Sequence, residues 1–126
     1  MNHKCKPVKV GSCVVGDGSF SIWAGPCSVE SLAQLRETAL QVKKFGAVGL
    51  RGGLFKLRTD PNTFQGLGHD AYAIVRQVKQ EVGMPFVSEV TDPRQIGDLF
   101  DVVDAFQVGS RNMHNYSLLQ ELSRLE

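Results

Sequence analysis

The sequence has almost no excess of charge of either sign. Its 126 residues contain 14 Lys or Arg and 13 Asp or Glu, which gives a formal net charge of +1. Proteins that bind nucleic acid generally present a broad positive surface to the phosphate backbone. The near balance therefore argues against a nucleic-acid partner, and any positive potential that binds a ligand has to be local.

Long hydrophobic runs are also missing. A membrane-spanning helix needs roughly 18 or more consecutive apolar residues, and no run in the chain approaches that length. The first residues, MNHKCKPVKVGSC, lack the apolar segment of a signal peptide. We therefore expect no membrane association and a cytoplasmic location.

Cysteine is scarce as well. Cys5, Cys13 and Cys27 cannot all pair within one chain, and their spacing matches no zinc-finger pattern, so we expect reduced thiols. Cys5 and Cys13 belong to the N-terminal segment, where we expect no chemical role. Cys27 follows a predicted strand and is either a small buried apolar residue or a metal ligand.

What the sequence does contain is an alternation of strands and helices. A chain of this length with 42% hydrophobic residues fits a single domain, residues 1–126. Residues 1–19 are predicted to form a β-hairpin segment with a Gly-rich turn, and residues 20–126 to form four βα units. The predicted strands are residues 20–24, 47–50, 84–90 and 105–108.

Capping residues and apolar spacing predict the helices. Ser31 with Gln34 three residues later is a capping-box pattern, and Asp92 followed by Pro93 is a typical helix start. A second helix is expected over about residues 70–81. The apolar residues expected to face the core are, in the third helix, Ile96, Leu99, Phe100 and Val103 and, in the closing helix, Leu118, Leu119, Leu122 and Leu125.

This alternation requires a parallel sheet with right-handed crossovers, because a parallel neighbour is reached only through a long connection. Two α/β architectures satisfy it: an open sheet, or half of a (βα)8 TIM barrel with parallel strands. No G-x-G-x-x-G follows the first predicted strand, which weakens the dinucleotide-binding form of the open sheet.

The residues that could carry chemistry follow the predicted strands. The loop from Arg51 to Gly66 combines glycines with three cations, Arg51, Lys56 and Arg58. Glycine lets backbone N–H groups approach an anion while the cations bind its oxygens. The alternative is a basic loop that is simply solvated.

Three further candidates, Cys27, Glu89 and Arg111, also follow strands. Barrel enzymes build their sites at the carboxyl ends of the strands, so together these positions indicate a site. Taken singly, Glu89 could cap the next helix, and Arg111 could pair with Asp92 or Asp104.

Five segments, in order, carry a resemblance to a known family. They are Gly25–Ser31 (GPCSVES), Arg51–Thr59 (RGGLFKLRT), Phe64–Gly66 (FQG), Ser88–Val90 (SEV) and Gln107–Met113 (QVGSRNM). Together they resemble the 3-deoxy-D-arabino-heptulosonate 7-phosphate (DAHP) synthase family, especially its shorter bacterial branch. The related Kdo8P synthases carry a K-A-N-R-S type loop, so Lys56-Leu57-Arg58-Thr59 favours the DAHP side.

The resemblance implies a (βα)8 barrel transferase that condenses phosphoenolpyruvate with erythrose 4-phosphate in aromatic amino acid biosynthesis. It implies a divalent metal of the Mn, Fe, Co or Zn type, with Cys27 as a ligand. The resemblance implies that the catalytic pair Arg51 and Lys56 binds phosphoenolpyruvate together with Arg111. It implies that Arg58 and Thr59 bind erythrose 4-phosphate, and that Glu89 and Ser110 lie in the substrate site.

Two residues depart from the family pattern: Leu57 stands in place of proline and Ser110 in place of alanine. A complete barrel takes roughly 200 residues or more, so we expect the chain to correspond to the N-terminal half. The remaining metal ligands and cations are expected in the second half, and we expect the isolated chain not to be a competent enzyme.

The expected open sheet edges predict association, either as a homodimer or with a complementary half-barrel. Two alternatives to an enzyme stay open. One is a non-catalytic half-barrel that binds phosphorylated ligands or a partner synthase, and the other is a gene fragment without an independent role.

Overall fold

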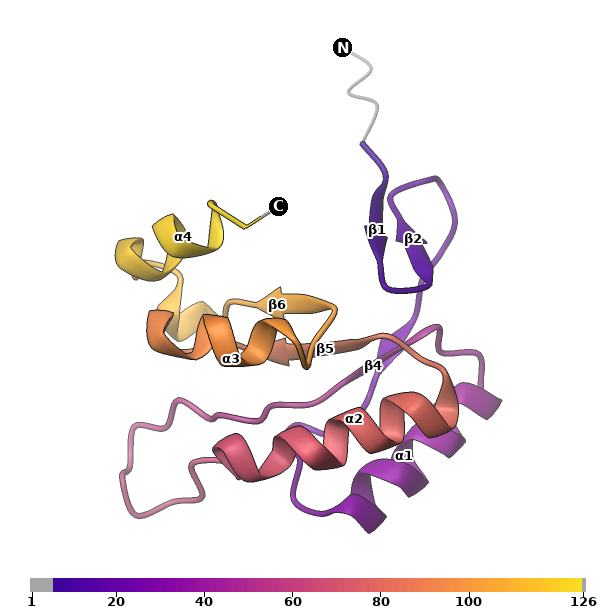
Figure 1. The fold of residues 1–126 in the computed structure, drawn as a ribbon, viewed down its shortest axis with the longest axis horizontal. Helices are drawn as coiled ribbons and strands as arrows, with labels where there is room; N and C mark the ends of the chain where they lie inside the picture. The colour runs from indigo at the N-terminus through magenta and orange to yellow at the C-terminus, as the bar shows by residue number, and fades with distance from the viewer. Residues whose placement is uncertain (1–5, 126) are drawn as a thin grey trace.

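A computed structural model describes residues 6–125, so Cys5 lies outside the described residues. The described chain forms a small antiparallel sheet and a four-stranded parallel sheet, joined to helices (Figure 1). The small sheet pairs β1 (Val8–Val10) with β2 (Cys13–Val15). This confirms the predicted hairpin, whose turn lies at Gly11 and Ser12.

The hairpin packs against the amino ends of the parallel strands. A side chain on Gly11 would meet Pro85 and Asp104, which precede two of those strands, and the Cys13 thiol donates a hydrogen bond to the Val48 carbonyl at 3.2 Å. In Figure 1 the hairpin stands on the side of the sheet away from α1 and α2. It therefore covers one end of the face that is turned away from α1 and α2, which we call the inner face.

The parallel sheet has the strand order β3-β4-β5-β6, so each strand pairs with the next one along the chain. The strands are β3 (Trp23–Ala24), β4 (Gly49–Arg51), β5 (Phe86–Glu89) and β6 (Ala105–Gln107). The predicted succession of parallel βα units is confirmed.

The first strand is shorter than predicted. Phe20 is 90% exposed, and regular pairing starts only where the Ile22 carbonyl accepts from Val48 N at 2.9 Å. The five-residue prediction for this strand was therefore wrong at its beginning, because no neighbouring strand reaches Phe20 to pair with it.

In residues 6–125, four α-helices and three 3-10 turns connect and follow the strands. Helices α1 and α2 lie side by side on one face of the sheet (Figure 1). The helices are α1 (Leu32–Lys44), α2 (Ala71–Val82), α3 (Ile96–Phe100) and α4 (Tyr116–Leu122), and the turns are η1 (Gly68–Asp70), η2 (Pro93–Gln95) and η3 (Ser110–Asn112).

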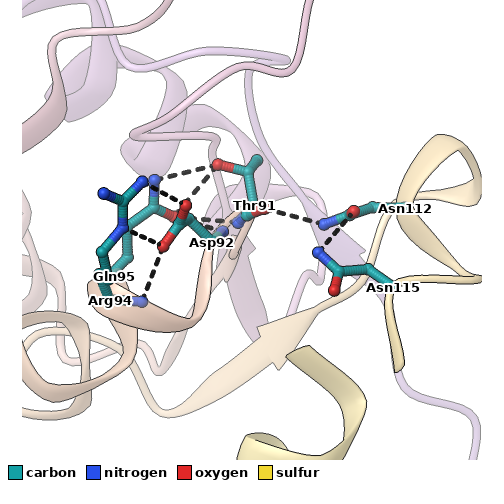
Figure 2. Close-up of polar contacts among 6 residues, drawn as sticks. All are labelled: Thr91, Asp92, Arg94, Gln95, Asn112 and Asn115. Atoms are coloured by element: carbon teal, nitrogen blue, oxygen red, sulfur yellow. Dashed lines mark hydrogen bonds and ion pairs between the residues drawn. The ribbon is translucent and has the colours of Figure 1, made fainter. Parts of the chain in front are cut away.

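Both predicted helix starts are confirmed, with a difference at the first. The Ser31 side chain accepts from Gln34 N at 3.1 Å, but the Gln34 side chain reaches Glu30 N and not Ser31 N. At Asp92 both halves of the capping box are present: Asp92 accepts from Arg94 N, and Gln95 accepts from Asp92 N (Figure 2).

The core lies between the sheet and the helices. Its fully buried side chains include Leu35, Leu50, Val75, Phe86 and Leu99. The prediction for the third and fourth helices was wrong at two positions: Phe100 is 51% exposed and Leu125 is 36% exposed. Helix α3 ends at Phe100 and α4 at Leu122, and Val102 and Val103, after α3, are buried in the core.

An ion pair ties α2 to the amino ends of β5 and β6. Lys79 Nζ lies 2.7 Å from Asp104 Oδ2 and donates to the Val102 carbonyl, and the same Asp104 oxygen accepts from Phe86 N at 2.7 Å. The Asp104 carboxylate therefore joins a helix to two strands. Within residues 6–125, no helix is both long and apolar enough to cross a membrane.

The contact between Gly49 and the sole tryptophan, Trp23, generates a prediction about stability. A methyl group on Gly49 would overlap the Trp23 ring, so Gly49→Ala forces the ring to move. We expect a loss of about 1–3 kcal/mol in the free energy of unfolding, as for other overpacked cores. Urea unfolding followed by Trp23 fluorescence measures it.

The matched control is Gly97→Ala in α3, where an added methyl meets no atom within 4 Å. We expect that variant to be neutral or slightly stabilising, because alanine restricts the unfolded chain and favours helix. Equal stability of the two variants would contradict the assignment of a packing role to Gly49.

Candidate anion-binding site

Arg51, the last residue of β4, joins the carboxyl ends of two other strands. Its Nη1 donates to the Pro26 carbonyl at 3.1 Å, just after β3, and its Nη2 donates to Gln107 Oε1 at 3.4 Å, at the end of β6. The predicted cation is therefore held on the inner face of the sheet, at the edge where strand ends converge.

The segment after β3 continues the parallel pairing beyond the regular strand. Gly53 N donates to the Cys27 carbonyl at 3.2 Å, and Val29 N donates to the Gly53 carbonyl at 2.9 Å. A side chain on Gly53 would meet both the Cys27 carbonyl and the aliphatic part of Lys56. Glycine at this position lets the two loops approach, which places Cys27 beside Lys56.

Lys56 links three strand ends. Its Nζ donates to the Cys27 carbonyl at 3.0 Å and lies 3.8 Å from Glu89 Oε2, with only 9% of the Lys56 side chain and 13% of the Glu89 side chain exposed. A nearly buried charge needs such partners, because removal from water is costly. The structure therefore brings Cys27, Lys56 and Glu89 together, as predicted from their places after strands.

The loop that carries Lys56 is anchored at two points. Leu54 N donates to the buried Ser88 hydroxyl at 3.3 Å, and Lys56 N donates to the Gln65 carbonyl at 2.8 Å. Ser88 therefore fixes the beginning of the loop against β5, next to Glu89. This contact lies on the face of the sheet that α1 and α2 cover, and it fixes the backbone of the loop that carries Lys56.

Cys27 is exposed, which rules out its interpretation as a small buried residue. The Lys56 ammonium lowers the pKa of the Cys27 thiol below its usual value, mainly as a hydrogen-bond partner and then through its charge, and partial burial opposes this. The charges of Arg51 and Arg58 contribute in the same direction. The positive charge of this site thus favours a thiolate at Cys27.

Glu89 does not cap the following helix, because Asp92 performs that role. The Glu89 carboxylate instead lies against Gly109, where an added Cβ would overlap Oε1. It therefore faces both the Lys56 ammonium and the turn that follows β6.

The remaining predicted residues lie on exposed loops. Arg58 and Thr59 are exposed and precede a turn in which the Asp60 side chain accepts from Asn62 N at 2.9 Å. Ser110 and Arg111 are exposed in η3. The structure records no contact that brings these four residues to Lys56, so their roles stay predictions.

Arg111 has neither of the ion-pair partners considered for it. Asp92 pairs with Arg94 at 2.7 Å and Asp104 pairs with Lys79 at 2.7 Å. Among the described residues the exposed Arg111 guanidinium forms no ion pair or hydrogen bond.

Two contributors, Gln107 and Ser88, had no role in the sequence prediction. Gln107 is in register with Glu89 across β5 and β6 and contacts Arg51, and Ser88 holds the cationic loop. The available signal was a polar residue at the end of an apolar strand, which by itself does not identify a partner.

A cavity of about 520 Å³ lies between the hairpin and the inner face of the sheet. Its walls are mainly apolar, with Arg51 and Gln107 as the polar side chains. The lining residues are Val8, Val10, Val15, Trp23, Arg51, Val87, Ala105 and Gln107. The cavity therefore extends from the Arg51 side of the site toward the hairpin.

The described residues do not form a complete metal centre. Catalytic zinc sites typically use three protein ligands, and within residues 6–125 no three His, Cys, Asp or Glu side chains are grouped closely enough to hold an ion. Cys27 could supply one ligand, because its thiol is exposed and its pKa is lowered.

The parallel βα units, with cations at the carboxyl ends of the strands, are typical of part of a βα-barrel protein, and these cations make up its candidate anion-binding site. A family model agrees with this and is more specific. The model of the DAHP synthetase I family matches residues 5–126, and the chain belongs to that family.

Two named bacterial proteins are similar to this chain in sequence. The chain is 38% identical over 114 residues to a phospho-2-dehydro-3-deoxyheptonate aldolase of Thermotoga maritima, and 30% identical over 112 residues to a 2-dehydro-3-deoxyphosphooctonate aldolase of Vesicomyosocius okutanii subsp. Calyptogena okutanii. The alignment with the first protein includes 90% of this chain and 34% of that protein's length. The alignment with the second includes 83% of this chain and 40% of that protein's length.

Solved structures confirm the fold. The crystal structure of the Thermotoga maritima DAHP synthase aligns over 92% of the chain with a TM-score of 0.82 and 35% identity, and a truncated form of that enzyme aligns with a TM-score of 0.78. The chain covers 33% and 41% of these two structures. It therefore forms part of a (βα)8 barrel, and the predicted resemblance is confirmed.

The environment of Cys27 generates a prediction about its reactivity. Replacing Lys56 by methionine removes the main cause of the lowered pKa, so the pKa of the Cys27 thiol should rise toward its usual value. Alkylation rates rise with the thiolate fraction, so the pH at half-maximal rate should move upward. Iodoacetamide alkylation across pH measures this in a chain with Cys5 and Cys13 replaced by serine.

Lys44→Met is the matched control, because Lys44 is exposed in the last turn of α1 and is no cause of the Cys27 shift. Its alkylation profile should equal that of the parent chain. A profile of Lys56→Met that also equals the parent would show that Lys56 does not set the state of the thiol.

Proposed function

We propose that this chain is a DAHP synthase-type protein whose strand-end site binds phosphoenolpyruvate for condensation with erythrose 4-phosphate. The observation that carries the proposal is the position of the Lys56 ammonium, held between the Cys27 carbonyl and Glu89. Family membership supports it, since the Thermotoga maritima relative is named a DAHP synthase.

Arg51 and Lys56 are suited to bind the phosphate and carboxylate of phosphoenolpyruvate. Arg51 is oriented by carbonyl and amide oxygens and has no carboxylate partner among the described residues, so its charge is not neutralised. Lys56 is oriented by its ion pair with Glu89. We propose Arg111 as a third cation for this ligand.

The second substrate is assigned to the outer part of the same loop. Arg58 and Thr59 are exposed beyond Lys56, and we propose that they face the phosphate of erythrose 4-phosphate. Relatives named 2-dehydro-3-deoxyphosphooctonate aldolase have a different product. The loop sequence Lys56-Leu57-Arg58-Thr59 favours the DAHP reaction.

A metal of the Mn, Fe, Co or Zn type is also part of the proposal. Cys27 would be one ligand, and the others would come from residues outside the described set. Because the described donor set is incomplete, we expect that this chain alone binds phosphoenolpyruvate without catalysing the condensation.

A non-catalytic role in ligand binding is the second candidate function. It is supported by the cations that the described residues hold at the strand ends. In either case we propose that the sheet is completed by a second copy or by a complementary half-barrel, because β3 and β6 each have one neighbour in the described sheet.

Phosphoenolpyruvate binding tests the proposed site. Lys56→Ala should weaken binding by tenfold or more, because one charge-assisted hydrogen bond contributes about 1.5–3 kcal/mol. Lys44→Ala, which removes an exposed lysine from α1, should leave the affinity unchanged. Isothermal titration calorimetry measures both, and circular dichroism verifies folding.

The same samples, supplied with manganese and erythrose 4-phosphate, test for catalysis through release of inorganic phosphate. We expect binding without release. Steady phosphate release by the isolated chain would contradict the expected dependence on further residues, whereas equal affinities of the parent and Lys56→Ala would contradict the site itself.

Association is tested by sedimentation velocity on the parent chain at micromolar concentration. Unpaired strand edges and an inner face that the hairpin covers at one end only favour self-association, so we expect a species of at least twice the monomer mass. A single folded monomer across this concentration range would argue against a homodimer and leave the complementary half-barrel as the proposed partner.

A further inference from the structure

We propose that Asn112 is a positioning residue that fixes the turn carrying Arg111 against the end of β5 and thereby increases affinity for an anionic ligand. The inference rests on the proposed function, because it takes Arg111 as a ligand-binding cation. Asn112 itself is not assigned a contact with the ligand.

The Asn112 amide is held at both of its polar ends. Its Nδ2 donates to the Thr91 carbonyl at 2.9 Å, and its Oδ1 accepts from Asn115 Nδ2 at 3.2 Å (Figure 2). Two partners of opposite hydrogen-bonding character specify the orientation of the amide group. The side chain therefore connects η3 and α4 to the loop that follows β5.

The receiving loop is itself rigidly held. Gln95 Oε1 accepts from Thr91 N at 2.9 Å and from Asp92 N at 3.3 Å, and Gln95 Nε2 donates to the Thr91 hydroxyl at 3.0 Å. Figure 2 shows Gln95 and Thr91 on one side of this network and Asn112 and Asn115 on the other. The Thr91 carbonyl is therefore a well-fixed anchor for the turn.

The turn is constrained at its two ends, with Arg111 between them. At one end the Glu89 carboxylate lies against Gly109, and at the other Asn112 is bonded to Thr91. Asn112 N also donates to the Gly109 carbonyl at 2.9 Å, which closes the turn on itself. Thr91 follows Glu89 by two residues, so both constraints use the end of β5.

These contacts hold the backbone of Arg111 without occupying its guanidinium, which is exposed and has no recorded partner in residues 6–125. Binding an anion to a cation on a mobile turn would require ordering of both the side chain and the turn. A turn that is already ordered avoids the second cost. Loss of the Asn112 contact should therefore weaken binding, but only where Arg111 takes part in it.

A double-mutant cycle with phosphoenolpyruvate as the probe tests this dependence. We expect Arg111→Ala to weaken binding by about tenfold or more and Asn112→Ala by about fivefold. The double variant should bind no more weakly than Arg111→Ala alone. Gln77→Ala, which removes an exposed amide with one hydrogen bond on α2, is the matched control and should bind as the parent does.

The outcomes separate this inference from the proposed function. Failure of the parent to bind phosphoenolpyruvate, or an unchanged affinity in Arg111→Ala, overturns the proposed role of Arg111 and this inference with it. A weaker Arg111→Ala combined with an unchanged Asn112→Ala, or with additive losses in the double variant, overturns the inference alone. Additive losses would mean a general structural effect.

Circular dichroism shows whether each variant folds. If Asn112→Ala does not fold, Asn112→Ser takes its place in the cycle, because a serine hydroxyl is small and polar but too short to replace the amide contact with Thr91. The same fold-changes and the same contradicting results apply to that variant.

Discussion

The site depends on the contact of the Lys56 ammonium with the Cys27 carbonyl and the Glu89 carboxylate. These three residues come from the ends of three neighbouring parallel strands, and a nearly buried ammonium is stable there only with such partners. The close approach of the two loops requires glycine at Gly53. The lowered pKa of Cys27 and the orientation of Glu89 toward the turn after β6 both follow from this arrangement.

The fold was predictable where local physics determines it. The caps at Ser31 and Asp92 form because their side chains satisfy N–H groups within three residues, which a sequence displays directly. The exposed positions of Phe20 and Phe100 were not predictable in this way. Their burial depends on whether a strand finds a neighbour and on where a short helix ends, and both are tertiary effects.

In the candidate site, too, some features follow from the local sequence and others depend on the tertiary structure. The placement of Cys27, Lys56 and Glu89 at one edge follows from the rule that parallel strands end together. The support from Gln107, Ser88 and Asn112 does not follow, because each contact joins residues far apart in the chain through a register that only the folded sheet determines. Strand ends can thus be located from sequence before the groups that orient them are known.

The two ends of the described sheet have different chemistry, and this difference sets the direction from which a ligand can approach. At the amino ends, the hairpin turn covers Pro85 and Asp104, and Asp104 is neutralised by Lys79. At the carboxyl ends, Arg51 faces a mostly apolar cavity and has only carbonyl and amide oxygens as recorded partners. The positive charge that is not offset by a carboxylate therefore lies at the carboxyl edge, which is the side from which the proposed anionic ligand would approach.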